Sequence, residues 1–201
     1  FYGFDTTDAV IAAMHDTITG RKATLQKFNT IGWYGRLLSH HKDSSALNYD
    51  VRLAYYNLQD NYQAMENNFV LSSDLTTYLP TSEFIHIYIK MDYNDDRFYK
   101  DADSMRILTN TVLTLRPEIT TRGPKYKFTV GVNGSLDVIG DLYADFYISP
   151  RVYFSYNLIE DIMIPYVGVA GGLNRNTIRS LSEENPFIMT DIHDDNSNTS
   201  G

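Results

Sequence analysis

The stretch from Tyr126 to Val138, Tyr-Lys-Phe-Thr-Val-Gly-Val-Asn-Gly-Ser-Leu-Asp-Val, alternates between two kinds of residue without a break. Every second position is apolar or glycine, namely Tyr126, Phe128, Val130, Val132, Gly134, Leu136 and Val138. The positions between them are mostly polar. Successive side chains of a β-strand point to opposite faces. The period of two therefore predicts one long strand with an apolar face and a polar face.

The length of this stretch is as informative as its alternation. Strands in soluble proteins average about 5–6 residues. At about 3.3 Å per residue, Tyr126 to Val138 would be roughly 43 Å long. A tilt of about 40° reduces the rise to roughly 33 Å, enough to cross the apolar band of an outer membrane, which is about 25 Å tall. The length favours a strand that spans a membrane.

The same alternation continues on both sides of this stretch. After a short turn at residues 139–141 it runs from Leu142 to Leu158, and a second short turn leads into residues 162–173. Upstream, alternating or strand-like segments are joined by polar stretches at residues 40–46, 94–104 and 120–125, which are expected to be loops. We expect about eight antiparallel strands in an up-and-down transmembrane β-barrel.

Three parts are expected along the chain. Residues 1–22 form an N-terminal segment with a possible short helix at residues 5–18, residues 23–189 supply the barrel strands, and residues 190–201 form a polar tail or loop. Pro150 falls inside a long alternating run, where it removes a ladder donor. We expect it to mark a bulge or the point where the strand leaves the membrane.

Composition excludes several classes of function. The 201 residues include no cysteine, and the net charge is −8 at pH 7. Thiol chemistry and disulfides are therefore excluded, and nucleic acid is not expected as a partner because phosphate binding needs a basic surface. No apolar run is long enough for a transmembrane helix. No secretory signal is present, so we expect that it has been removed or that the chain is an interior piece of a longer protein.

The two faces of the strands predict two environments. In a membrane barrel the apolar face meets lipid and the polar face meets the lumen. The lipid-facing candidates are Tyr126, Phe128, Val130, Val132, Leu142, Phe146, Ile148, Phe154 and Tyr156. The lumen-facing candidates are Arg116, Glu118, Lys127, Asn133, Asp137, Asp145 and Arg151. The alternative is a soluble β-sandwich or lipocalin-like barrel that binds an apolar ligand, with the same faces exchanged.

Three stretches carry a resemblance to a known group of proteins: Phe146–Asp161, Ile164–Asn174 and Arg179–Phe187. They resemble outer-membrane barrel proteins of Bacteroidetes that are described as porin-like or TonB-dependent-receptor-like. The resemblance is best from about Lys125 to Phe187, and these stretches are expected to be strands and a turn. It implies a barrel in the outer membrane of a Gram-negative bacterium, with the lipid bilayer and other outer-membrane proteins as partners.

The chain departs from that resemblance in two ways. It has no TonB box and no plug domain, and it does not finish on a strand with a terminal aromatic residue. We therefore expect part of a larger barrel, with closure by about eight strands as the alternative. The expected function is passive passage of small solutes or a place in a larger outer-membrane complex. The barrel part of a TonB-dependent transporter is a further alternative.

Other constellations point to no chemistry. His40 and His41 are adjacent and lack a third ligand, while the acidic residues at 94–96, 101 and 103 lack the spacing of a calcium loop. The acidic residues around His193 are treated in the same way. No Ser-His-Asp set or phosphate-binding loop occurs, and Gly168, Gly171 and Gly172 lie within an expected strand. We expect no enzyme activity, no metal and no cofactor.

Overall fold

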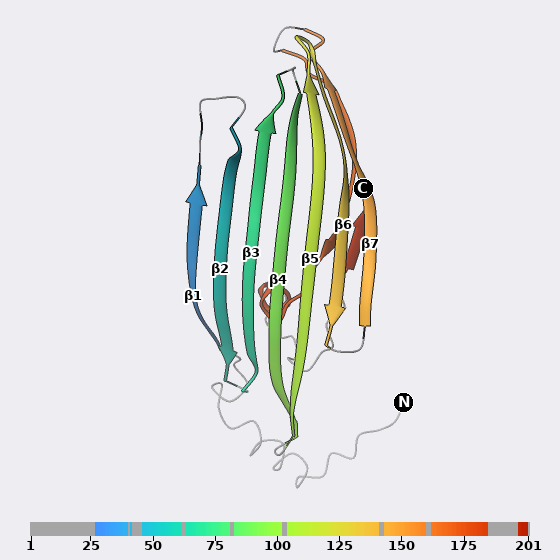
Figure 1. Ribbon diagram of the computed structural model, residues 1–201. Coiled ribbons are helices and arrows are strands. Elements are labelled where there is room, and N and C mark those ends of the chain that lie inside the picture. The colour runs from blue at the N-terminus through green and yellow to red at the C-terminus, as the bar shows by residue number, and fades with distance from the viewer. Residues whose placement is uncertain are drawn as a thin grey trace, which may run out of the picture.

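The computed structural model describes residues 27–39, 41, 46–61, 63–80, 83–101, 104–140, 143–159, 162–184 and 197–200. Within these residues the strands form one antiparallel sheet in which each strand is hydrogen-bonded to the next in sequence (Figure 1). The strands are β1 (Phe28–Leu38), β2 (Asn48–Asp60), β3 (Met65–Tyr78), β4 (Glu83–Asp101), β5 (Ser104–Arg122), β6 (Tyr126–Ile139), β7 (Tyr143–Tyr156), β8 (Tyr166–Asn174) and β9 (Ser197–Ser200). The predicted all-β, up-and-down antiparallel fold is confirmed.

The stretches with alternating polarity form strands in the structure, as predicted. β6 begins at Tyr126 and ends at Ile139, one residue beyond the predicted end. It pairs with β7 at every position from Tyr126↔Tyr156 to Ile139↔Tyr143. Period two and a short connection were sufficient here because both strands have one wholly apolar face.

Two predicted loops are wrong. Residues 94–101 belong to β4, and residues 120–122 belong to β5, so that each of these strands is 19 residues long. Asn94 pairs with Asn110 and Asp96 pairs with Leu108 across the hairpin. Backbone pairing holds these polar residues in the sheet, although their side chains show no apolar alternation that a sequence pattern would detect.

The prolines act at specific points of the ladder. The pairing of β5 with β6 skips Pro117, which has no N–H to donate. Pro150 keeps its place opposite Val132 within β7, so it marks neither a bulge nor the end of the strand. The pairing of β7 with β8 begins at Arg151 instead, so Pro150 lies where β8 parts from β7.

The end of β8 and the helix after it turn to one side of the sheet. Arg151–Ser155 of β7 pair with Tyr166–Ala170 of β8, whereas Gly171–Asn174 pair with β9. Helix α2 (Ile178–Glu184) follows and lies behind β4 in Figure 1. The backbone N–H of Arg179 donates to the Glu66 carboxylate of β3 over 3.0 Å, which fixes α2 against the sheet.

This helix and β9 differ from the sequence prediction. Residues 178–184 were expected to be strand or turn, and residues 197–200 were expected to be part of a polar tail. Thr177 caps α2, since its Oγ1 accepts a hydrogen bond from the N–H of Ser180 over 3.0 Å. The possible helix at residues 5–18 lies outside the described residues.

One face of the sheet is mostly polar and buried, and the other face is mostly apolar and exposed. Among the described residues, fifteen polar or charged residues are buried, against five apolar ones. Large apolar side chains are exposed on nearly every strand, from Ile31 at 69% to Val169 at 52%. The polar face is the one that α2 and the end of β8 cover.

Candidate functional site

The candidate site is the polar face of the sheet, and the register shows which side chains share it. Glu118 of β5 pairs with Gly131 of β6, and Gly131 pairs with Arg151 of β7. Directly opposed residues in a sheet point to the same side. By the same reasoning, all seven predicted lumen-facing residues lie on this face: Arg116, Glu118, Lys127, Asn133, Asp137, Asp145 and Arg151.

Two of these residues converge on the carboxylate of a third, Glu118. Arg116 Nε lies 3.0 Å from Glu118 Oε1, and Arg151 Nε lies 2.6 Å from the same oxygen. The Glu118 side chain is 10% exposed, whereas that of Arg151 is 38% exposed. Neither contact has the alignment of a hydrogen bond, so charge attraction holds the three groups together.

His86 extends this cluster to the next two strands. Its Nδ1 lies 3.8 Å from Glu118 Oε2, and its Nε2 lies 2.9 Å from Oδ1 of Asp74 on β3. The imidazole therefore bridges two carboxylates across β3, β4 and β5.

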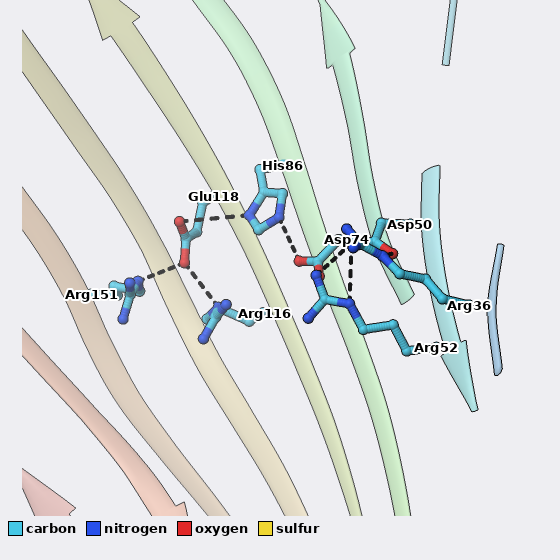
Figure 2. A network of polar contacts seen from close by, with 8 residues as sticks. All are labelled: Arg36, Asp50, Arg52, Asp74, His86, Arg116, Glu118 and Arg151. Atoms are coloured by element: carbon cyan, nitrogen blue, oxygen red, sulfur yellow. Dashed lines mark hydrogen bonds and ion pairs between the residues drawn. The ribbon is translucent and has the colours of Figure 1, made fainter. Parts of the chain in front are cut away.

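The row of charges continues to the edge of the sheet. Arg36 of β1 donates two hydrogen bonds of 2.8 Å to the carboxylate of Asp50 on β2. Arg52 also bonds to Asp50, and its guanidinium lies 3.8 Å from Asp74. Figure 2 shows the resulting network, which runs across the strands from Arg36 to Arg151. We call these eight residues the charge ladder: Arg36, Asp50, Arg52, Asp74, His86, Arg116, Glu118 and Arg151.

Sequence reasoning found only the part of the charge ladder on β5 and β7. It missed the five residues on β1 to β4, namely Arg36, Asp50, Arg52, Asp74 and His86. All of these except Arg36 occupy polar positions of alternating segments. What brings them into line is the register between neighbouring strands, which pairs Asp50 with Asp74 and His86 with Glu118. The sequence pattern of a single strand does not contain that information.

The other predicted lumen residues have separate surroundings. Lys127 Nζ lies 5.7 Å from the centre of the Tyr153 ring, a cation–π arrangement. Asn133 donates to the main-chain oxygen of Gly171 over 3.1 Å, which holds the inturned end of β8. Asp137 is buried, while Asp145, its register partner, is exposed.

A second polar cluster lies under α2. Arg175 Nη1 contacts Asp92 Oδ1 at 2.6 Å, and both side chains are 8% exposed. Arg175 also donates to the main-chain oxygens of Asp92 and Asn110 over 2.9 and 3.1 Å. Lys90 and Asn68 contact the same Asp92 carboxylate at 2.9 Å each. The sequence pattern singled out none of these four residues.

The apolar face leaves large apolar side chains exposed. Phe146 and Ile148 are 65% and 67% exposed, and the other described lipid-facing candidates are between 38% and 46% exposed. Leu142 lies outside the described residues. No apolar patch of this extent is usual on a soluble monomer.

Aromatic residues gather at one level of the apolar face. Trp33 pairs with Tyr55, Tyr55 with Phe69, and Phe69 with Tyr93, so the four form a row across β1 to β4. The Trp33 and Tyr55 rings are 6.2 Å apart. Tyr126 and Tyr156 pair at the opposite end of the sheet. We call the first four residues the aromatic row.

No metal site emerges within the described part of the chain, where no three His, Cys, Asp or Glu side chains are grouped to hold an ion. Asn94, Asp95 and Asp96 lie in β4, and Asp95 pairs with Arg97 at 2.6 Å. In the same residues, no helix has the length and apolar character needed to cross a membrane.

Comparison with known proteins adds no assignment. No protein-family model matches this sequence, and no curated protein is significantly similar to it.

Proposed function

We propose that this sheet is part of the wall of a β-barrel in a bacterial outer membrane, with its polar face toward an aqueous passage for small solutes. The observation that carries the proposal is the inverted polarity of the sheet. Charged and amide side chains are buried on one face, and large apolar side chains are exposed on the other. Lipid covers an apolar face of this kind without further protein.

The dimensions of the apolar face support a membrane. On β4 the outward residues from Ile85 to Tyr93 are all apolar or aromatic. The nine residues of this stretch are about 30 Å long at about 3.3 Å per residue. On β6 the corresponding run from Tyr126 to Val138 is about 43 Å long by the same rise. With the strand tilt of a barrel, these lengths fit an apolar band about 25 Å tall.

The edges of the sheet bear on how the barrel is completed. Among the described residues, β1 has a partner only in β2, and Tyr143–Pro150 of β7 have a partner only in β6. An unpaired backbone group in lipid costs several kcal/mol, so membrane sheets close on themselves. We therefore propose that further strands pair with these edges and that the wall belongs to a larger barrel or outer-membrane complex.

Two substitutions on β7 test the orientation. Ile148 is 67% exposed on the apolar face, and Asp145 is exposed on the polar face. Neither substitution empties a packed core. We expect Ile148→Lys to abolish insertion into liposomes, because a lysine near the bilayer midplane costs about 2–4 kcal/mol. Asp145→Lys places the same charge on the aqueous side and is expected to insert like the unchanged chain.

The measurement is liposome flotation combined with gel migration of unboiled samples. A folded species that floats with the lipid and migrates faster before boiling is the expected result for the unchanged chain and for Asp145→Lys. Equal insertion of both variants would show that the faces are wrongly assigned. Cooperative folding without lipid or detergent would instead support a soluble β-barrel. In such a barrel the two faces are exchanged, and an apolar ligand would bind against the apolar face.

A further inference from the structure

The polar face divides by charge along the strands. The half nearest the β3–β4, β5–β6 and β7–β8 connections, at the top of Figure 1, carries seven cations and three carboxylates. The cations are Arg36, Arg52, Lys90, Arg116, Arg122, Lys127 and Arg151, and the carboxylates are Asp50, Asp74 and Glu118. The other half carries the carboxylates Asp60, Glu66, Asp92, Asp96, Asp137 and Asp145 with the cations Arg106, Arg175 and Arg179.

In the basic half the carboxylates of Asp50 and Glu118 lie deeper than the arginines Arg36, Arg52 and Arg151. The side chains of Asp50 and Glu118 are 13% and 10% exposed, whereas those of Arg36, Arg52 and Arg151 are 46%, 43% and 38% exposed. Figure 2 shows these acids between their arginine partners. A solute at this face therefore meets guanidinium groups first. Guanidinium groups present paired donors that match the oxygens of a carboxylate or phosphate.

A cavity lies beside this part of the charge ladder. It has a volume of about 430 Å³, and its lining includes His86, Glu118, Lys127 and Arg151 from β4, β5, β6 and β7. The rings of Phe84 and Tyr153 line it as well. This volume is within the range of sites for small molecules, about 300–1,000 Å³.

The rings are already paired with cations. Arg122 lies 5.0 Å from the centre of the Phe84 ring, and Lys127 lies 5.7 Å from the centre of the Tyr153 ring. The cavity thus offers charge and aromatic surface side by side. The hydroxyls of Thr120 and Thr129, 2.8 Å apart, add neutral hydrogen-bonding groups to its lining.

We propose that this cavity binds small organic anions with a carboxylate or phosphate head and a ring or apolar body. The head lies against Lys127 and Arg151, and the body lies against Tyr153 and Phe84. This inference rests on the proposed function, because it names the class of solute that the polar face selects.

Equilibrium dialysis of the full chain folded in a nonionic detergent tests the proposal, with detergent alone as the blank. Three probes share one chromophore: 4-nitrobenzoate as the anion, 4-nitrobenzyl alcohol as the neutral probe and 4-nitrobenzylammonium as the cation. We expect the anion to bind at least about tenfold more tightly than either of the others. 4-Nitrophenyl phosphate distinguishes the head groups, and it is expected to bind in the same range as the carboxylate.

Substitutions locate the binding. Lys127→Gln is expected to weaken the anion by about fivefold or more, since it removes one charge from the cavity. Lys127→Arg is expected to keep the binding. Arg106→Gln is the matched control, because Arg106 is an exposed cation of the same face at the opposite end of β5. Equal binding of anion and cation, or equal losses in Lys127→Gln and Arg106→Gln, would overturn the proposal.

Dialysis separates this inference from the proposed function. It requires a folded chain but no insertion and no conduction. If the anion binds and Ile148→Lys still inserts like Asp145→Lys, the anion site stands and the membrane orientation falls. If the orientation holds and the probes bind alike, only the anion site is overturned.

Discussion

Glu118 is the residue on which the β5–β7 end of the charge ladder depends. Its carboxylate is the counter-charge for Arg116 of β5 and Arg151 of β7, and it lies near His86 of β4. Removal of a buried partner leaves the opposite charges without compensation. Removal of one arginine leaves the other in place. The residues of this network are therefore expected to contribute unequally to the free energy of unfolding.

A double-substitution cycle checks that inequality. We expect Glu118→Gln to lower the free energy of unfolding by about 1–3 kcal/mol, less than for a fully buried pair because Arg151 is partly in water. Arg151→Gln is expected to lower it by less than about 1 kcal/mol. Urea titration in lipid or detergent gives these values. If the double variant loses the sum of the two single losses, the pair does not interact and the ladder is only a row of neighbouring charges.

Among the elements, α2 is the one that depends most on side-chain contacts. It has seven residues, too few to be stable by itself. Arg175, just before the helix, forms a buried ion pair with Asp92, and Glu66 accepts a hydrogen bond from the first turn. These contacts fix the segment against the polar face.

Arg175→Met tests this attachment. We expect it to lower the free energy of unfolding by about 3–5 kcal/mol, because Asp92 then keeps a buried charge that only Lys90 offsets. Glu183→Gln is the control. It removes an exposed pair within α2 and is expected to change stability by less than about 0.5 kcal/mol. Hydrogen exchange at residues 178–184 shows whether the helix itself is released. Similar losses in the two variants would mean that the Arg175 contacts do not hold α2.

The same elements show how far a sequence pattern reaches. β6 and β7 were predicted almost to the residue, because each has a complete apolar face and a short connection. The ends of β4 and β5 were missed because Asn94, Asp95 and Asp96 are held by pairing with the neighbouring strand and not by apolar burial. α2 was missed because it is short and follows a strand. The one local sign of a helix in the sequence was Thr177, which caps α2 by accepting a hydrogen bond from the N–H of Ser180.

At the scale of the whole molecule, the aromatic row would give the sheet a position relative to the bilayer of the proposed membrane barrel. Tryptophan and tyrosine concentrate where the apolar core of a membrane meets water. Trp33 is the only tryptophan of the chain, and it is 52% exposed on the apolar face. Its fluorescence therefore reports on one level of the sheet.

Brominated lipids measure that level. We expect Trp33 to be quenched most by bromines near the head groups, because the proposed membrane barrel places the aromatic row at an interface. A Trp33→Phe, Leu115→Trp variant moves the probe to an apolar-face residue that is 52% exposed. Leu115 lies about 13 Å farther along the sheet from the row, at about 3.3 Å per residue. This variant is expected to be quenched most by bromines deep in the chains. Strong quenching of Trp33 by aqueous acrylamide, with none by bromine, would contradict a lipid-facing row.

The order of strands has a consequence for how such a wall varies over evolution. Because each strand pairs with its neighbours in sequence, a hairpin can be duplicated or deleted without rethreading the rest of the chain. The diameter of a β-barrel grows with its strand number. In the proposed barrel, pore calibre would therefore be a modular property, adjustable in steps of two strands.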